Sequence, residues 1–399
     1  MKTGKTLLLT SSYPRFKGDY AGTFVAEYAR LFKSLGEVTV LAPADLKVDP
    51  KYRPFDIPVL RFASRYNKKR GPFYGSGGPE NLRKFNRLIE SPLAFWQMFK
   101  AASSQARNVD NIISHWMVPA GLIGALIKRK NQKLQIVVHG GDWHLLRKFP
   151  LGKKLARYII RKADDVIVVA KYQQNQILDL FNNRKQSLMQ TRIRHLPMGI
   201  DIRKFSKNVS PEDNKNNSKP VVLAVGRLVP IKGFDRLAKA LEDLDLQLWI
   251  AGDGPQRDSL EKTFKKHNID VRFLGMLSSD KLVDVYHLAD MLVFPSRPEN
   301  GRVEGTPRVL IEAMAAKCPI VATATGGVSE LLVHQSDSML DYLDDKELKS
   351  NIKCLLDSKQ IRTRLANKAF EKVRKMDWSK ISTQVLDVFE VKNAKNING

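Results

Sequence analysis

The sequence of 399 residues predicts an α/β protein with two Rossmann-like domains, each built on a parallel sheet, that face a central cleft. Three observations lead to this fold class. Short apolar segments rich in Val, Ile and Leu alternate with helix-like stretches, as in parallel sheets. The chain is long for one hydrophobic core but ordinary for two. A polar stretch near its middle, Asn208–Pro220, has the composition of a linker.

The expected strands fall into two sets, one on each side of this stretch. The first set is Thr6–Thr10, Val38–Leu41, Asn111–Ser114, Gln135–His139 and Val166–Ala170. The second set is Val221–Val225, Gln247–Ala251, Arg272–Leu274, Met291–Phe294 and Ile320–Ala322. Between the first two strands, Thr23–Leu35 has apolar residues at helical spacing. Ligands of open α/β sheets bind beyond the carboxyl ends of the strands, so the cleft is the expected site.

The formal net charge is +26, and the two halves of the chain carry it unequally. Residues 1–200 hold 35 Lys and Arg against 13 Asp and Glu, a net charge of +22. Residues 201–399 hold 32 against 28, a net charge of +4. This asymmetry indicates that the first half meets a polyanion, either nucleic acid or an anionic membrane.

No apolar run approaches the roughly 20 residues of a membrane-spanning helix. Leu7–Leu9 is too short for the core of a signal peptide. Only Cys318 and Cys354 are present, so a disulfide framework is not expected and a reducing compartment fits. These features predict a cytoplasmic protein, either free or peripheral.

Basic residues of the first half are mixed with aromatic and aliphatic ones in Arg61–Tyr74, Arg83–Phe99 and Arg147–Lys162. The last segment is expected to form a helix with Leu155, Tyr158 and Ile159 on one face. Lys154, Arg157 and Arg161 fall on another face. That pattern is typical of a helix lying on anionic lipid. The alternative is a basic, solvated face on a helix that is otherwise buried.

The strongest motif runs from Phe294 to Glu330. Glu304 and Glu312 enclose the segment EGTPRVLIE, in which a helix is expected to start near Pro307. The N–H groups at such a helix start bind anions, so the amides around Gly305–Val309 are expected to face a diphosphate. The two carboxylates are about two helical turns apart along the axis, so each can bind hydroxyl groups of a different part of one elongated ligand. The alternative is an ordinary solvated helix with two surface Glu residues.

EGTPRVLIEA resembles the E-x7-E signature of the retaining GT-B glycosyltransferases known as family 4. Further matches are VGRLVPIKG at 225–233, IAGDGP at 250–255, LPMGID at 196–201, FLGMLSSDKL at 273–282 and VVHGGDW at 137–143. The resemblance covers nearly the whole chain. The loop SRPENGRVEGTP looks most like transferases of bacterial surface-polysaccharide and exopolysaccharide assembly.

The resemblance implies roles for individual residues. Glu312 would bind the donor ribose and Glu304 the donor sugar, while Arg227 and Lys232 would grip the diphosphate. A cationic pair stabilises the charge that grows on a leaving diphosphate. Gly22 would open the first helix beside a phosphate, although Ala21 stands where a Gly pair is common. His139 would contact the sugar near the reacting centre, and Asp142 beside it is open to either a functional or a structural role. The complete expected donor site is Gly22, Arg227, Lys232, Glu304, Gly305, Thr306, Pro307, Arg308, Val309 and Glu312, with His139, Glu304, Arg227 and Lys232 as the catalytic set.

The resemblance also implies a retaining front-face reaction without metal or cofactor, with a nucleotide-sugar as donor. It implies a first domain over residues 1–198 that binds the acceptor, often lipid-linked. It further implies a second domain over 199–378 and a terminal helix within 379–399 that returns to the first. The expected location is the inner face of the cytoplasmic membrane.

Other readings predict different residues. The E-x7-E pattern disfavours a nucleotide-sugar epimerase of the same fold, and a sugar phosphorylase would need a pyridoxal lysine context that we do not recognise. From another class, a non-catalytic GT-B scaffold predicts lost cleft residues, yet Arg227, Lys232, Glu304 and Glu312 are present. A basic-surface protein that binds nucleic acid predicts a stacking platform or known module, and none is recognised.

Overall fold

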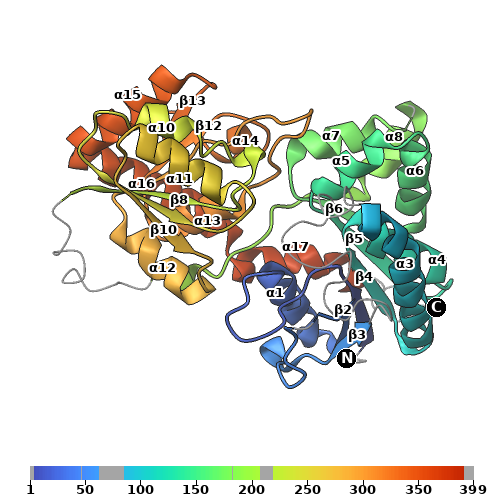
Figure 1. The fold of residues 1–399 in the computed structure, drawn as a ribbon. Coiled ribbons are helices and arrows are strands. Elements are labelled where there is room, and N and C mark those ends of the chain that lie inside the picture. Colours follow the sequence, from blue (N-terminus) through green and yellow to red (C-terminus); the bar gives the residue numbers. More distant parts are fainter. Residues whose placement is uncertain (1–3, 46, 63–84, 182, 207–218, 391–399) are drawn as a thin grey trace. The chain divides into compact units, whose positions relative to one another are not determined.

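The computed structural model describes residues 4–45, 47–62, 85–181, 183–206 and 219–390 and divides into two compact units (Figure 1). Unit 1 comprises Met1–Pro197 and Ile381–Gly399, and unit 2 comprises Met198–Lys380. The expected linker lies outside the described residues except for Lys219 and Pro220. The basic segment Arg61–Tyr74 lies outside them from residue 63 onward, as do the first two residues of Arg83–Phe99.

Unit 1 holds a seven-stranded sheet in which all neighbouring strands run parallel. The strands are β1 (Gly4–Leu9), β2 (Gly36–Pro43), β3 (Val59–Phe62), β4 (Asn111–His115), β5 (Lys133–Val138), β6 (Asp165–Val168) and β7 (Ile193–His195). Their order across the sheet is β3-β2-β1-β4-β5-β6-β7. The middle strands are buried on both faces, which explains why they read as continuous apolar runs in the sequence.

The helices of unit 1 precede or follow these strands along the chain. They are α1 (Thr23–Leu31), α3 (Phe85–Gln105), α4 (Leu122–Ile127), α5 (Gly141–Lys148), α6 (Gly152–Lys162), α7 (Lys171–Leu178), α8 (Asn183–Gln190) and, from Ile381 onward, α17 (Trp378–Glu390). Helix α17 comes from the far end of the chain. It packs Phe389 against Phe32, with ring centroids 5.2 Å apart, and its Val385 carbonyl accepts a hydrogen bond from Gln135 of β5.

Unit 2 repeats the architecture with six parallel strands. The strands are β8 (Val221–Val225), β9 (Gln247–Ala251), β10 (Val271–Gly275), β11 (Met291–Phe294), β12 (Ile320–Thr323) and β13 (Met339–Asp341). The helices are α9 (Ile202–Phe205), α10 (Arg236–Ala240), α11 (Arg257–Lys266), α12 (Ser279–Leu288), α13 (Arg308–Ala315), α14 (Val328–Leu331), α15 (Asp345–Asp357) and α16 (Lys359–Val373). The strand order is β10-β9-β8-β11-β12-β13, and two buried apolar clusters pack the sheet and its helices together.

Both sheets reverse their strand order at one point, between β1 and β4 in unit 1 and between β8 and β11 in unit 2. Ligands of doubly wound sheets bind at this switch point, beyond the carboxyl ends of the strands. In unit 2 the loops that leave the switch point are those containing GRLVPIKG and EGTP. The topology therefore brings the two strongest motifs to one edge of one sheet.

All ten expected strands are confirmed, with ends that differ by up to two residues. The sequence analysis missed β3, β7 and β13, which are three or four residues long. In addition, the structure describes no helix that is both long and apolar enough to cross a bilayer.

The prediction of one interfacial helix over Arg147–Lys162 is wrong. The segment is divided into α5 and α6 by the turn at residues 149–151. Of the expected apolar face, Ile159 is fully buried in the core of unit 1 and Leu155 is packed against that core, so only Tyr158, which is 38% exposed, remains accessible. The basic face of α6 is therefore a solvated face on a buried helix.

Candidate functional site

The loop after β8 carries Arg227 and Lys232 on a tightly constrained backbone. Gly226 has φ 153° and Gly233 has φ 63°, and a side chain at Gly233 would lie 2.1 Å from the carbonyl of Pro295. Arg227 and Lys232 are both partly exposed. Glycine at both positions lets the loop turn twice and keep close contact with the loop that follows β11.

Lys232 and Glu304 form an ion pair across these two loops. The Lys232 Nζ lies 3.1 Å from the Glu304 Oε1, and 4.9 Å from the centre of the Phe294 ring at the end of β11. The side chains are only 16% and 17% exposed, so bulk water screens the pair less than it would on an open surface. A cation and a carboxylate are thus held side by side where strand order reverses.

The turn after β12 supports the backbone of Glu304 and Gly305. The amide of Gly327 donates to the carbonyl of Glu304 at 3.1 Å. Side chains at Gly326 or Gly327 would lie 2.4 Å from the Glu304 carbonyl or 2.1 Å from the Gly305 carbonyl. Gly326 and Gly327 therefore allow the turn after β12 to pack closely against the backbone of Glu304 and Gly305.

Glu312 lies in α13 with its carboxylate already hydrogen-bonded at both oxygens. The hydroxyl of Tyr286 shares its proton between Oε2 at 3.2 Å and the carbonyl of Val309 at 3.3 Å, and Nε of Arg308 donates to Oε1 at 2.9 Å. The residue is 8% exposed, and Tyr286 is almost completely buried. Burial and the nearby Glu312 charge raise the pKa of Tyr286 well above its ordinary value, so this hydroxyl remains a donor. The arrangement fixes the carboxylate in one orientation.

Helix α13 begins as expected beside Pro307. Pro307 takes an extended conformation, with φ −70° and ψ 118°, and no side chain caps the helix start. Arg308 and Val309 form its first turn, and Glu304, Gly305 and Thr306 precede it, so Glu304 lies in the loop and only Glu312 lies on the helix. The first-turn amides thus lack the capping side chain that often occupies this position.

In unit 1, Gly22 occupies the start of α1 in a left-handed conformation with φ 73°. A side chain there would lie 2.6 Å from the backbone of Ser12, so both conformation and space require glycine. Ala21 is buried next to it. Ala21 in place of a glycine therefore does not disturb this turn, because Gly22 occupies the position that requires glycine.

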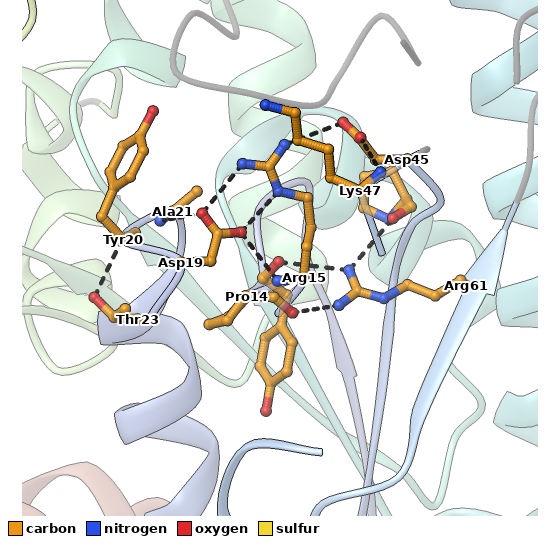
Figure 2. A network of polar contacts seen from close by, with 11 residues as sticks. Pro14, Arg15, Asp19, Tyr20, Ala21, Thr23, Asp45, Lys47 and Arg61 are labelled. Atoms are coloured by element: carbon orange, nitrogen blue, oxygen red, sulfur yellow. Dashed lines mark hydrogen bonds and ion pairs between the residues drawn. The ribbon is translucent and has the colours of Figure 1, made fainter. Parts of the chain in front are cut away.

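Figure 2 shows the polar network that holds the loop between β1 and α1. Arg15 bonds Asp19 through Nε at 2.7 Å and Asp45 through Nη1 at 3.2 Å, and all three side chains are at most 10% exposed. Arg61 of β3 donates to the carbonyls of Pro14 and Pro43. The loop that ends at Gly22 is thereby tied to the neighbouring strands.

His139 follows β5 and meets His115, the last residue of β4. The His115 Nδ1 and His139 Nε2 lie 2.9 Å apart, and the ring planes differ by 16°, so the rings meet edge to edge. Burial, together with His139, lowers the pKa of His115 well below its ordinary value. His139 keeps part of its surface exposed, yet the surrounding protein lowers its pKa to about 3. Both rings are neutral at pH 7.

Since each neutral ring carries one proton, the pair has two possible arrangements. The His115 Nε2 is buried and has no hydrogen-bond partner among the described residues. If His139 Nε2–H donated to His115 Nδ1, His115 would carry its proton on the buried Nε2, where this N–H would have no acceptor. If His115 Nδ1–H donates to His139 Nε2, the His115 Nε2 keeps only a lone pair. Buried N–H groups without an acceptor are the rarer case. The geometry therefore favours a His139 that accepts at Nε2 and carries its proton on Nδ1.

Asp142 lies in the first turn of α5, and its carboxylate joins two loops. Its Oδ2 accepts from the amide of Met117 at 2.7 Å, and its Oδ1 accepts from the amide of Gly140 at 2.9 Å. The residue is 4% exposed, and burial raises its pKa in spite of these hydrogen bonds. This geometry favours the structural role for Asp142, because it holds the loop that contains His139.

The structure brings the expected site residues together in two groups. In unit 2, Lys232 pairs with Glu304 and Arg308 with Glu312. In unit 1, Phe24 of α1 has its ring 5.1 Å from that of His139, two residues after Gly22. Their roles remain predictions.

The sequence analysis missed His115 and Tyr286. The position of His115 at a strand end was the available signal, whereas Tyr286 looked like an ordinary apolar residue of a helix. No group of three or more His, Cys, Asp or Glu residues within the described ranges could hold a metal ion.

Comparison with known proteins adds a family to this geometry. Residues 206–372 match the model of glycosyl transferases group 1, and residues 21–189 match that of the glycosyl transferase 4-like domain. An uncharacterised glycosyltransferase of Methanocaldococcus jannaschii is 29% identical over 289 residues, which cover 72% of this chain and 76% of the relative. A GDP-mannose-dependent monoacylated alpha-(1-6)-phosphatidylinositol monomannoside mannosyltransferase of Corynebacterium glutamicum is 26% identical over 317 residues, 75% of this chain and 81% of that one.

Solved structures show the same fold. Sucrose-phosphate synthase from Thermosynechococcus elongatus superposes with a TM-score of 0.76 at 21% identity, covering 98% of this chain and 100% of that one. The Anabaena protein HepE in complex with UDP and glucose superposes with a TM-score of 0.73 at 20% identity, covering 97% and 99%. These structures show the GT-B fold, and the two family models, which together match most of the chain, show that it belongs to the family 4-like glycosyltransferases.

Proposed function

We propose that this glycosyltransferase is retaining and metal-independent, and that it transfers a hexose from a nucleoside-diphosphate sugar. The proposed acceptor is a lipid-linked saccharide or glycolipid at the anionic inner face of the cytoplasmic membrane, in surface polysaccharide or glycolipid synthesis. The observation that carries the proposal is the arrangement of Lys232, Glu304, Arg308 and Glu312 at the switch point of unit 2.

Each of these groups suits one part of such a donor. The carboxylate of Glu312, oriented by Tyr286, is an acceptor for two ribose hydroxyls. The α13 start and the cations Arg227 and Lys232 suit the diphosphate. Glu304 would then exchange its bond to Lys232 for bonds to sugar hydroxyls.

The same residues support departure of the diphosphate during transfer. Negative charge grows on the leaving phosphate, and fixed cations in a poorly hydrated site stabilise that change. Arg227 and Lys232 would supply positive charge without a metal. In a front-face reaction the acceptor hydroxyl attacks the carbon from the side that the phosphate leaves, and the phosphate oxygen takes its proton. His139, neutral and protonated on Nδ1, would donate a hydrogen bond to the sugar.

The names of relatives support the substrate classes. The Corynebacterium relative is described as a GDP-mannose-dependent mannosyltransferase acting on a phosphatidylinositol glycolipid, and HepE was solved with UDP and glucose. A Bacillus subtilis relative, 28% identical over 349 residues, is a putative teichuronic acid biosynthesis glycosyltransferase. The basic unit 1 suits acceptors held at an anionic surface.

The test is a panel of UDP-, GDP-, ADP- and dTDP-sugars. Thermal shift and slow donor hydrolysis are recorded for the wild type and Glu312→Ala. We expect one donor to stabilise the protein, because a ligand of the folded state raises stability by mass action, and we expect the variant to lose this effect. A folded protein that responds to no donor would favour a non-catalytic scaffold.

Stereochemistry and metal dependence need separate readouts. With the identified donor and an acceptor lipid, proton NMR of the product reports the anomeric configuration. Retention of the donor configuration and unchanged rates in excess EDTA are expected. Inversion, or loss of activity that Mg²⁺ or Mn²⁺ restores, would contradict the proposed mechanism.

A further inference from the structure

Five consecutive exposed residues, Arg147–Leu151, lead from α5 into α6. Two of them are large and apolar: Phe149 is 56% exposed and Leu151 is 66% exposed. We call residues 149–151, which form the sequence Phe-Pro-Leu, the 149–151 tip. Adjacent exposed apolar side chains at the apex of a turn mark a contact with something outside the molecule more often than scattered ones do.

The 149–151 tip is held in place by an ordered backbone. The amide of Phe149 donates to the carbonyl of Leu146 at 3.2 Å, and the amide of Gly152 donates to the carbonyl of Phe149 at 2.9 Å. A side chain at Gly152 would lie 1.6 Å from the Leu146 carbonyl, so only glycine closes this turn. The apolar side chains are therefore displayed by a preformed turn.

All charged residues that flank the tip in the sequence are basic. Between Trp143 and Ala163 there are seven Lys and Arg residues and no Asp or Glu. Lys148, Lys153 and Lys154 are exposed on both sides of the apolar pair. Arg147 is fixed by a hydrogen bond of 2.8 Å to Gln176, which also accepts from Trp143.

We propose that the 149–151 tip inserts into the interfacial region of an anionic bilayer, while the lysines around it bind lipid headgroups. Apolar residues flanked by cations have this preference. The proposal rests on the membrane contact in the proposed function, but it assigns that contact to the tip instead of to the buried apolar face of α6. Helix α5 has eight residues, so its rise places the tip about 12 Å from the loop that holds His139. A lipid-linked acceptor could bridge that distance.

Two other occupants fit the tip less well. A second copy of the chain would bring two strongly basic regions together, which is unfavourable. Single-stranded nucleic acid usually stacks on several aromatic side chains, and this tip has one aromatic ring beside a proline and a leucine. The basic charge and the residue composition of the tip together favour lipid.

The experiment measures sedimentation of the full-length protein with sucrose-loaded vesicles of phosphatidylcholine, with or without 30% phosphatidylglycerol. The test variant is Phe149→Ser/Leu151→Ser. The matched control is Leu188→Ser, because Leu188 of the same unit is 65% exposed. We expect the partition coefficient on anionic vesicles to fall at least tenfold in the test variant and to stay unchanged in the control. In Phe149→Trp, the added fluorescence should shift to the blue with anionic vesicles.

Equal binding of the wild type and the test variant would overturn insertion, as would an unshifted emission spectrum of Phe149→Trp with vesicles bound. Loss of binding to single-stranded DNA in the test variant, with vesicle binding intact, would assign the tip to nucleic acid and also overturn it. Donor-induced thermal shift is measured on the same samples. If the donor stabilises the protein but the tip does not insert, the glycosyltransferase proposal stands and the insertion proposal fails. If the tip inserts but no donor stabilises the protein, insertion stands and the glycosyltransferase proposal fails.

Discussion

Variants of Tyr286 and Glu312 distinguish two contributions to donor affinity, the presence of the Glu312 carboxylate and its orientation. In Tyr286→Phe the carboxylate remains but loses the hydroxyl that donates to Oε2. A lost hydrogen bond to a charged group costs about 1.5–3 kcal/mol, so donor affinity should weaken by roughly tenfold or more. Titration calorimetry with the identified donor checks this. Tyr342→Phe, in the same unit but 65% exposed, is the control, and equal affinities of all three proteins would contradict the role of Tyr286.

His115 is expected to act through His139. In His115→Asn the side-chain amide can replace Nδ1–H as donor, whereas His115→Leu cannot. We expect kcat/KM to fall by about tenfold to a hundredfold in the Leu variant and to recover largely in the Asn variant. Nitrogen-15 shifts of His139 report its tautomer directly. A His139 protonated on Nε2 in the wild type would contradict the assigned arrangement.

The same pair predicts how stability depends on pH. Because the folded pKa values of both histidines lie below the unfolded value, their contribution to stability is complete above pH ~6.5 and is lost as the pH falls; for His139, whose folded pKa is about 3, the loss continues down to that pH. Asp142, with its raised pKa, contributes in the opposite sense but is common to the proteins compared. In His139→Asn the free energy of unfolding should fall less steeply, by up to about 1.4 kcal/mol per pH unit. Urea unfolding between pH 7 and 4.5 measures this, and parallel curves would count against the depressed pKa.

At the scale of elements, the turn after β12 positions the loop before α13. Gly327 has an ordinary φ of −70°, so Gly327→Ala is limited only by space, with its Cβ 2.1 Å from the Gly305 carbonyl. Overpacking of this kind costs about 1–3 kcal/mol and should displace Glu304. We expect kcat/KM to fall at least tenfold with a small loss in Tm. Gly4→Ala, whose nearest neighbour would be 3.6 Å away, is the control, and a fully active Gly327→Ala would refute the positioning role.

How far the sequence predicts these elements depends on their neighbours. Central strands such as β4 and β8 are buried on both faces and read as uninterrupted apolar runs. β13 has only three residues and follows a polar loop, so no periodicity marks it. The helix α6 was expected to offer Ile159 to lipid because amphipathic spacing does not distinguish a bilayer from the protein's own core. The E-x7-E segment could be found in the sequence, whereas the contact between Tyr286 and Glu312 arises from packing of α12 on α13.

For the whole molecule, the separate cores of the two units predict separate responses to ligand. Lys232, Glu304 and Glu312, the proposed donor-binding residues, all belong to unit 2. A nucleoside diphosphate at a hundred times its Kd should stabilise that unit by about 2.7 kcal/mol and leave unit 1 largely unchanged. Calorimetry should therefore show two unfolding transitions, and the nucleoside diphosphate should raise the Tm of only one of them.

Core variants assign these transitions. Ile320→Val lies in the core of unit 2 and Ile136→Val in that of unit 1, and both residues are fully buried. Each substitution typically costs about 0.5–1.5 kcal/mol and should lower only the transition of its own unit. A nucleotide that moves the transition lowered by Ile136→Val would contradict the assignment of the donor site.

The return of the chain to unit 1 has a consequence for synthesis on the ribosome. Every strand of the unit 1 sheet precedes Met198, yet the helix that pairs with Phe32 and Gln135 is α17, which starts at Trp378. While the intervening residues are being translated, this part of the first sheet lacks its covering helix, although unit 2 can already fold between the two crossings. The N-terminal half therefore gains its covering helix only after unit 2 has been translated. In a nascent chain stalled at Lys380, unit 1 would therefore lack most of α17 and expose the surface that this helix covers to ribosome-associated chaperones.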